Sequence, residues 1–159
     1  MSEFATMKNQ NFGTLAIHGG QEPDPSTGAV MPPIYQTSTY VQTSPGQHKG
    51  YEYSRTLNPT RHALEKALAS IELGSRGLAF GSGLAAVDAC MKLLKPGDEV
   101  ISCSDLYGGT YRQFVKIYEP FGIQFHFVDM DSPEQVTSLV NERTAMIWAE
   151  TPTNPMLNV

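Results

Sequence analysis

The sequence predicts an α/β protein built on a parallel sheet that helices cover on both faces. In the second half of the chain, short apolar segments alternate with helical segments of about ten residues, and Gly or Pro marks the joins between them. Parallel strands need such crossover helices, and the crossovers place helices on both faces of the sheet. The distinctive polar residues follow the ends of the predicted strands, where sheets of this kind bind their ligands.

The first 57 residues are expected to form an irregular arm. From Asn11 to Leu57 the chain is rich in Gly, Pro, Thr, Gln and Tyr and has neither helical nor strand periodicity. A stretch of this length without regular structure is unusual inside a compact domain. We therefore expect residues 1–57 to reach over another subunit, and residues 58–159 to form the α/β domain.

The α/β domain is predicted to open with a helix. Asn58 is a suitable N-cap, Pro59 suits the first helical position, and Gly74 stands where a C-terminal cap belongs. The next elements are a buried strand over residues 78–80, a Gly-Ser-Gly turn, and a helix over residues 84–94.

Three strands and two helices are predicted in the remaining chain. One helix is closed by Gly122, and the other begins with a capping box at Ser132. In order, the predicted elements are a strand over 99–103, a helix over about 110–121, a strand over 124–128, a helix from 133 and a strand over 145–149.

Composition limits the classes of function. The net charge of −5 and the absence of a basic cluster argue against a nucleic-acid or anionic-membrane surface. Cys90 and Cys103 form no disulfide or metal pattern, and no apolar run is long enough to span a bilayer or to serve as a signal peptide. We therefore expect a cytoplasmic protein. The four histidines are dispersed, so no metal site is expected.

The predicted strand, turn and helix around Gly81 and Gly83 form a candidate phosphate site. The glycines allow a sharp turn and leave space for a ligand, and the first N–H groups of the helix lie at the positive end of its dipole. The spacing of Gly81, Gly83 and Ala86, with Asp105 further on, also fits a dinucleotide fingerprint. At this point a phosphate cofactor, a dinucleotide and a turn that binds nothing all remain open.

Three other stretches carry candidate site residues. In an extended segment Tyr53 and Arg55 point to the same side, where a phenol and a guanidinium can grip a phosphate dianion. Tyr107, followed by two glycines, could stack on a flat cofactor ring. Glu150 and Asn154 lie in a Pro-rich loop that presents a carboxylate and an amide. Each stretch alone also fits a purely structural role.

Taken together, the four stretches resemble one family, the trans-sulfuration enzymes of Cys/Met metabolism. The similar motifs are Tyr-Ser-Arg-x-x-Asn-Pro-Thr, Phe-Gly-Ser-Gly-Leu-Ala-Ala, Asp-Leu-Tyr-Gly-Gly-Thr and Glu-Thr-Pro-Thr-Asn-Pro, in this order. These enzymes use pyridoxal 5'-phosphate (PLP) and include cystathionine γ-lyase, γ-synthase and β-lyase and methionine γ-lyase. The resemblance implies the N-terminal part of a fold-type I, aspartate aminotransferase-like enzyme, and it makes the dinucleotide interpretation a minor alternative.

The resemblance implies how the phosphate of PLP is held. Gly83 and Leu84 would donate backbone N–H groups, with Ser82 beside them. Tyr53 and Arg55 would reach the phosphate bound in the neighbouring subunit. A dimer would then be the catalytic unit, within a homo-oligomer that is a tetramer by resemblance.

The resemblance also implies roles at the reacting end of the cofactor. Tyr107 would stack on the pyridine ring and help to deprotonate the incoming amino group. Asn154 would lie by the ring 3-hydroxyl and the substrate carboxylate, and Glu150 would hold the site in place. Small amino acids are therefore the expected substrates.

The expected reaction is γ-elimination of cystathionine to cysteine, 2-oxobutanoate and ammonia. The alternative is γ-replacement of an O-acyl-homoserine by cysteine, as in cystathionine γ-synthase. The segment Pro45–Tyr53 resembles the corresponding segment of these two enzymes, and Gly109 stands where methionine γ-lyases typically carry cysteine. A dinucleotide-binding or non-catalytic dimerising module is the alternative from another class.

The lysines do not complete the family pattern. None stands in the motif of the family's Schiff-base lysine; they are Lys8, Lys49, Lys66, Lys92, Lys95 and Lys116. We therefore expect the chain to be the N-terminal part of an enzyme and to have no activity by itself.

Overall fold

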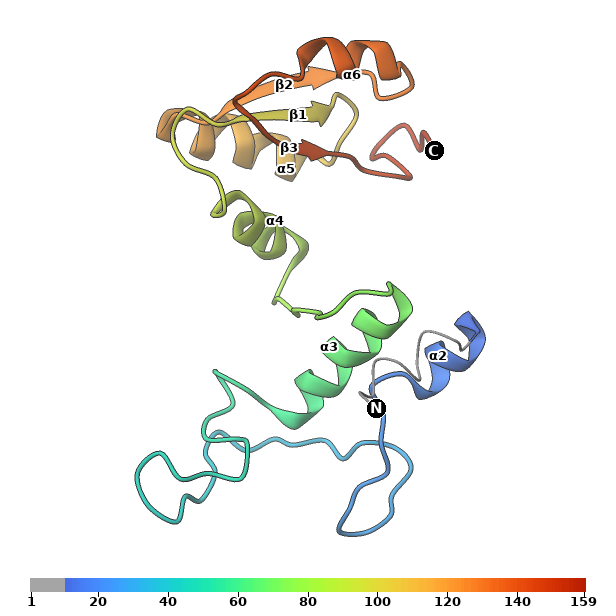
Figure 1. The fold of residues 1–159 in the computed structure, drawn as a ribbon, viewed down its shortest axis with the longest axis vertical. Coiled ribbons are helices and arrows are strands. Elements are labelled where there is room, and N and C mark those ends of the chain that lie inside the picture. The colour runs from blue at the N-terminus through green and yellow to red at the C-terminus, as the bar shows by residue number, and fades with distance from the viewer. Residues whose placement is uncertain (1–10) are drawn as a thin grey trace. The chain divides into compact units, whose positions relative to one another are not determined.

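The computed structural model describes residues 11–159, so residues 1–10 of the predicted arm lie outside the described part. The chain divides into two compact units that join in sequence between Ala79 and Phe80 (Figure 1). Within the described residues, no helix is both long and apolar enough to cross a membrane.

The N-terminal unit contains two helices, α2 (Phe12–His18) and α3 (Pro59–Ile71). The composition predicted an irregular segment over residues 1–57, but helix α2 shows that residues 11–57 are not irregular throughout. Helix α2 has only seven residues and buries Leu15 alone, so it is too short to show a period in the sequence. The chain after α2 packs closely on α3, because a Cβ at Gly19 would lie 2.1 Å from the Ser70 hydroxyl. Whether the segment forms an arm between subunits stays a prediction.

Helix α3 begins as predicted and ends differently. The Asn58 side chain accepts hydrogen bonds from the N–H groups of Thr60 and Arg61 at 2.9 and 3.4 Å, which confirms the N-cap. At the other end the left-handed residue is Leu73, with φ of 54°, and not the predicted Gly74. Gly74 lies one residue later, and its N–H donates to the Ala69 carbonyl at 2.8 Å.

Leu73 therefore occupies a position that favours glycine. Because its side chain is 73% exposed, Leu73→Gly removes a conformational penalty with little loss of packing. We expect the free energy of unfolding, measured by urea denaturation, to rise by about 0.5–1 kcal/mol. Leu93→Gly is the control: Leu93 is 81% exposed but lies outside the positive-φ positions, so glycine there should lower stability. A decrease in both variants would contradict the interpretation.

The C-terminal unit is built on three parallel strands, β1 (Glu99–Cys103), β2 (Gln124–Val128) and β3 (Thr144–Trp148). Their order is β2-β1-β3, so the first strand in sequence is central (Figure 1). All five residues of β1 are buried. The parallel sheet is thus confirmed; two strands have the predicted bounds, and the third begins and ends one residue earlier than predicted.

The predicted strand over residues 78–80 is wrong. These residues have no regular structure, and Leu78 and Phe80 are 61% and 45% exposed. The Ala79 N–H donates to the Glu65 carboxylate at 3.0 Å and not to a neighbouring strand. A short apolar run becomes a strand only where another strand pairs with it, and the run itself carries no information about that partner.

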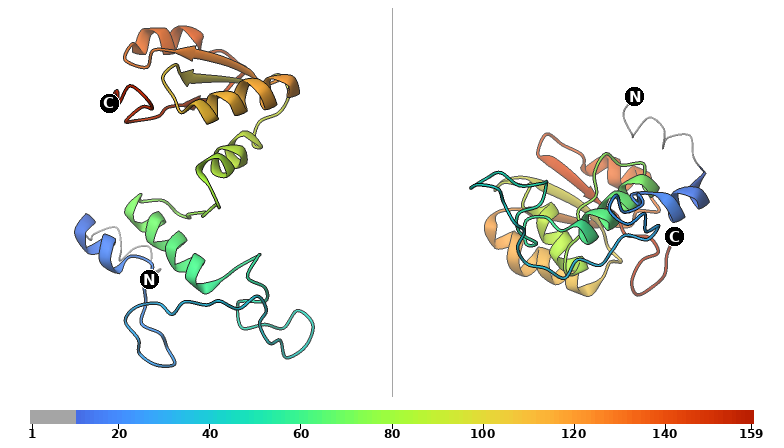
Figure 2. Two further views of the ribbon diagram at one scale, coloured as in Figure 1. Left: turned by 180° about the vertical axis from the view of Figure 1, so that it is seen from behind. Right: turned by 90° about the horizontal axis from the view of Figure 1, so that it is seen from below.

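Helices lie on both faces of the sheet. Helix α6 (Pro133–Leu139) covers one face, and α5 (Gly108–Gln113) with the π-helical segment η1 (Phe114–Tyr118) covers the other (Figures 1 and 2). A 3-10 turn, η2 (Glu119–Phe121), completes the helix predicted over 110–121, and Gly122 ends it with φ of 89°, as expected.

The predicted capping box at the start of α6 is wrong. Ser132 is the N-cap, but its side chain makes no capping hydrogen bond. Its hydroxyl lies 3.4 Å from the Glu134 carboxylate instead. In a capping box the partner side chain stands at the third helical position, which is Gln135 here. Glu134 stands one position earlier, and its carboxylate accepts from the serine hydroxyl.

Helix α4 (Gly83–Met91) is shorter than predicted and is held by both apolar and polar contacts. Val87 and Met91 belong to the core, in which Phe114 stacks on Phe125 with ring centroids 4.5 Å apart. The Tyr118 hydroxyl donates to the Asp88 carboxylate. Burial, together with this carboxylate, raises the pKa of Tyr118 to about 12.

A buried charge cluster lies at the start of β1, at the opposite end from the site described below. The Glu99 carboxylate is 2% exposed and is contacted by Asn141 Nδ2 at 2.9 Å, His126 Nε2 at 2.7 Å and Arg143 Nη2 at 2.5 Å. These donors, first the Asn141 amide and then His126, hold the pKa of Glu99 below its ordinary value of 4.5.

The cluster predicts a dependence of stability on acid. Because the pKa of Glu99 is lower in the folded state, its contribution is present above pH 4.5 and is lost as the pH falls below that value. We expect the Tm of the unaltered protein to fall more steeply below pH 4.5 than that of Glu99→Gln. Glu142→Gln, at an exposed carboxylate, is the control. Parallel curves for the unaltered protein and Glu99→Gln would contradict this account.

Candidate active site

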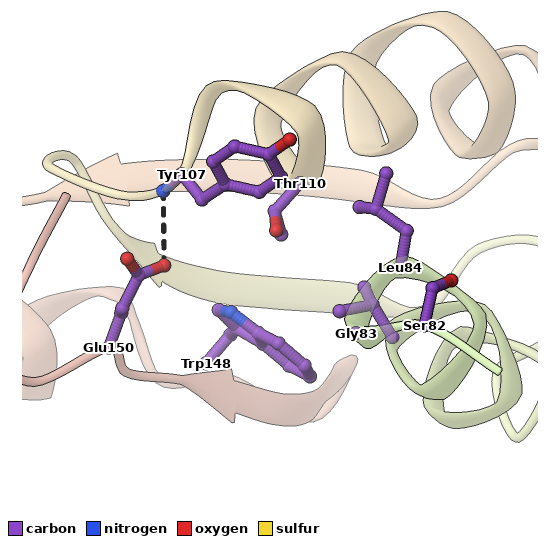
Figure 3. A pocket seen from close by; sticks show the side chains of 8 residues that line it. Ser82, Gly83, Leu84, Tyr107, Thr110, Trp148 and Glu150 are labelled. Carbon is purple, nitrogen blue, oxygen red and sulfur yellow. Dashed lines mark hydrogen bonds between the residues drawn. The ribbon is translucent and has the colours of Figure 1, made fainter. Parts of the chain in front are cut away.

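A cavity of about 470 Å³ lies between the N-terminus of α4 and the carboxyl ends of β1 and β3 (Figure 3). It belongs entirely to the C-terminal unit. Its position agrees with the rule that open α/β sheets bind ligands beyond the carboxyl ends of their strands. The lining residues are Ser82, Gly83, Leu84, Val87, Tyr107, Thr110, Trp148 and Glu150.

The N-terminus of α4 supplies hydrogen-bond donors to this cavity. Ser82 is the N-cap, and its hydroxyl accepts from the Ala85 N–H at 3.2 Å. The N–H groups of Gly83 and Leu84 have no partner among the described residues, and they lie at the positive end of the helix dipole. A Cβ at Gly83 would meet no atom within 4 Å, so space adjoins these donors.

Tyr107 and Glu150 form the other wall, as Figure 3 shows. The Tyr107 N–H donates to Glu150 Oε2 at 3.0 Å, which joins the loop after β1 to the end of β3. The Tyr107 ring lies over Gly109, where an added Cβ would be 2.4 Å from the ring carbon Cε1. Gly109 is thus required for this position of the ring, which is 48% exposed.

Three lining residues were not predicted. Trp148 is the last residue of β3, and Glu150 follows two residues later; both line the cavity, so the alternation of side chains along an extended segment could have identified Trp148. Thr110 and Val87 follow Tyr107 and Gly83 by one helical turn each, which is a weaker signal.

The loop that follows β3 is fixed by Asp105. The Thr153 hydroxyl and the Asn158 Nδ2 both donate to Asp105 Oδ2, the second at 3.3 Å. Asp105 therefore anchors this loop, although its position in the sequence also suggested a ribose-binding acid. Asn154 in the same loop is exposed and does not line the cavity.

Tyr53 and Arg55 belong to the N-terminal unit. The Arg55 guanidinium carbon lies 5.0 Å from the centroid of the Tyr53 ring, so the predicted pair is formed. Arg55 is exposed and has no carboxylate partner among residues 11–159. Its charge is available to an anionic ligand.

The cavity fits a cofactor that carries a phosphate and an aromatic ring. Two free N–H groups and a hydroxyl at a helix N-terminus suit the phosphate, and Tyr107 offers an aromatic face on the opposite wall. No lysine is among the lining residues in the described part of the chain.

The comparisons with known proteins agree with this chemistry. Residues 13–159 match the model of the Cys/Met metabolism PLP-dependent enzyme family. The chain is 53% identical to a probable cystathionine gamma-synthase of Herpetosiphon aurantiacus, over 93% of the chain and 46% of the relative. It is 52% identical to cystathionine gamma-lyase of Bacillus subtilis, over 92% of the chain and 38% of the relative. A cystathionine beta-lyase of Coxiella burnetii is 49% identical, over 96% and 40% respectively.

Solved structures are similar as well. The metB protein of Corynebacterium glutamicum matches with a TM-score of 0.91 and 42% identity, over 96% of this chain and 40% of that one. Cystathionine gamma-lyase of Lactobacillus plantarum, solved with L-serine, matches with a TM-score of 0.88 and 45% identity, over 94% and 39% respectively. The chain spans less than half the length of these relatives. It belongs to the Cys/Met metabolism PLP-dependent enzyme family.

Proposed function

We propose that the complete protein carrying this sequence cleaves cystathionine by PLP-dependent γ-elimination, which gives cysteine, 2-oxobutanoate and ammonia. The observation that carries the proposal is the pair of N–H groups at the start of α4 that have no partner among the described residues; they belong to Gly83 and Leu84, which line the same cavity as Tyr107 and Glu150. Relatives named cystathionine gamma-lyase, from Bacillus subtilis and other organisms, support the choice of reaction.

Two groups of residues are proposed to bind the phosphate of the cofactor. The N–H groups of Gly83 and Leu84 bind the phosphate, with the Ser82 side chain beside it, and Tyr53 and Arg55 bind the phosphate held by a neighbouring subunit. PLP, when bound, supplies an electron sink for the carbanion that forms at the substrate α-carbon. Asn154 does not line the cavity, so its proposed place near the ring hydroxyl and the substrate carboxylate is supported by the family resemblance alone.

Tyr107 is the proposed proton-transfer group. Its ring would stack on the cofactor, and its deprotonated phenol oxygen would take a proton from the substrate ammonium group, which leaves a neutral phenol and a free amine. Glu150 acts as a positioning residue, because its carboxylate holds the Tyr107 backbone at 3.0 Å. This bond fixes the backbone position from which the Tyr107 ring projects.

Cystathionine γ-synthase is the second candidate, and the 53% identity to the Herpetosiphon relative favours it. Two assays on the complete protein with added PLP separate the candidates. Release of 2-oxobutanoate from cystathionine supports the lyase, whereas formation of cystathionine from an O-acyl-homoserine and cysteine supports the synthase. Pyruvate and homocysteine would instead indicate β-elimination, and NAD binding without any PLP binding would contradict both candidates.

A cytoplasmic homo-oligomer, with a dimer as catalytic unit and a tetrameric assembly, belongs to the same proposal. The free thiols of Cys90 and Cys103 support a reducing compartment. We further propose that the 159 residues alone do not turn over cystathionine, because no lysine lines the described cavity.

The role of the helix N-terminus can be tested at one backbone atom. Gly83→Pro removes the Gly83 N–H, and proline suits this first helical position because Ser82 before it is extended. Gly83→Ala keeps the N–H and adds a Cβ that meets no protein atom. We expect Gly83→Pro to weaken PLP binding in equilibrium dialysis by about 10- to 100-fold relative to Gly83→Ala, as for a hydrogen bond to a charged group. Equal affinities would exclude this donor.

The role of the Tyr107 hydroxyl can be tested by Tyr107→Phe. The variant keeps the stacking ring, so the Kd for PLP should change little, while kcat should fall by about 100-fold or more. Tyr111→Phe is a matched control, since Tyr111 lies in α5, directly after Tyr107, is also 48% exposed and does not line the cavity. An unchanged kcat in Tyr107→Phe would remove Tyr107 from proton transfer.

A further inference from the structure

The segment that carries Tyr53 and Arg55 is held by a second arginine. Arg61, in the first turn of α3, donates from Nη1 to the Ser54 carbonyl at 3.0 Å and from Nη2 to the Thr56 carbonyl at 2.8 Å. These two carbonyls belong to the residues directly before and after Arg55. One planar guanidinium therefore fixes the backbone on both sides of Arg55.

Arg61 is itself held in place. Its Nε lies 3.7 Å from the Glu65 carboxylate, one helical turn further along α3. The Glu65 side chain is only 13% exposed, and its carboxylate also accepts from the Ala79 N–H at 3.0 Å. The charge of Arg61 is thus balanced, and its two Nη atoms are already used by the protein.

The two arginines differ in what they leave available. Arg61 is 32% exposed in its side chain and has protein partners for all three nitrogens. Arg55 is exposed, and its described contact is the Tyr53 ring. The Arg55 side chain is therefore exposed to a ligand, whereas Arg61 contacts the residues beside Arg55 only through their backbone.

We propose that Arg61 is a positioning residue for phosphate binding by Tyr53 and Arg55. This inference rests on the proposed function, in which these two residues bind the phosphate of PLP. An ion pair with a phosphate requires the loop to stay in one conformation, and ordering a mobile loop on binding lowers the affinity. Arg61 orders the loop before the ligand arrives. Lysine is a poor replacement, because its one nitrogen would have to reach both carbonyls, which the guanidinium contacts from two separate nitrogens.

A double-mutant cycle tests the proposal on the complete, assembled protein. The Kd for PLP is measured by equilibrium dialysis for Arg61→Gln, Arg61→Lys, Arg55→Gln and the double variant Arg61→Gln/Arg55→Gln. We expect Arg61→Gln to raise the Kd by about 10-fold when Arg55 is present and by less than about 2-fold when it is absent. Arg61→Lys should resemble Arg61→Gln.

Two references separate positioning from a general loss of structure. Pyridoxal lacks the phosphate, so its affinity should not change in Arg61→Gln. Arg76→Gln removes the same charge from an exposed arginine of the N-terminal unit and should leave the Kd for PLP unchanged. If Arg61→Gln does not assemble, Arg61→Lys takes its place in the cycle, because it keeps the charge.

The outcomes distinguish this inference from the proposed function. An effect of Arg61→Gln that is equal with and without Arg55, or that extends to pyridoxal, overturns the positioning role. An unchanged Kd in Arg61→Gln, with a raised Kd in Arg55→Gln, also overturns the positioning role and leaves the proposed function intact. An unchanged Kd in Arg55→Gln contradicts the proposed phosphate contact, and the positioning role then fails with it.

Discussion

The parallel pairing of β1 on both of its edges is the constraint on which the C-terminal unit depends. Because β2 and β3 run in the same direction as β1, all three strands end at one edge of the sheet. Tyr107 and Glu150 are 43 residues apart in sequence. Each lies in the segment that follows one of two neighbouring strands, and a hydrogen bond joins them at this edge. All five residues of β1 are buried, so both faces of the central strand are covered by other parts of this unit.

Most of the fold follows from the sequence where local and long-range preferences agree. Strands 99–103 and 124–128 have the predicted bounds, and Asn58 caps α3 as expected. The errors occur where another part of the molecule decides. Residues 78–80 are apolar but have no strand beside them, and Leu73 takes the left-handed conformation although a glycine follows it. In both cases the residue types are compatible with two outcomes, and the sequence pattern does not choose between them.

The sequence predicted the backbone donors of the candidate site, but it predicted only some of the side chains that line the cavity. A strand end or a helix start fixes where a side chain lies, so Tyr107 and Glu150 could be assigned to one edge in advance. Trp148 and Thr110 line the cavity because of the side-chain direction within their elements, which residue type alone does not indicate. Asn154 lies in a loop, where no period sets the direction, and the structure leaves it exposed.

The position of Trp148 makes it an intrinsic fluorescence probe of the cavity. It is the single tryptophan among the 159 residues, it lines the cavity, and its ring meets Phe114 edge-on with centroids 5.7 Å apart. One side of the indole therefore faces the packed core, and the other faces the space that a ligand would fill. Displacement of water from that space lowers the polarity around one known ring, so the emission of this chain reports on a single place in the fold.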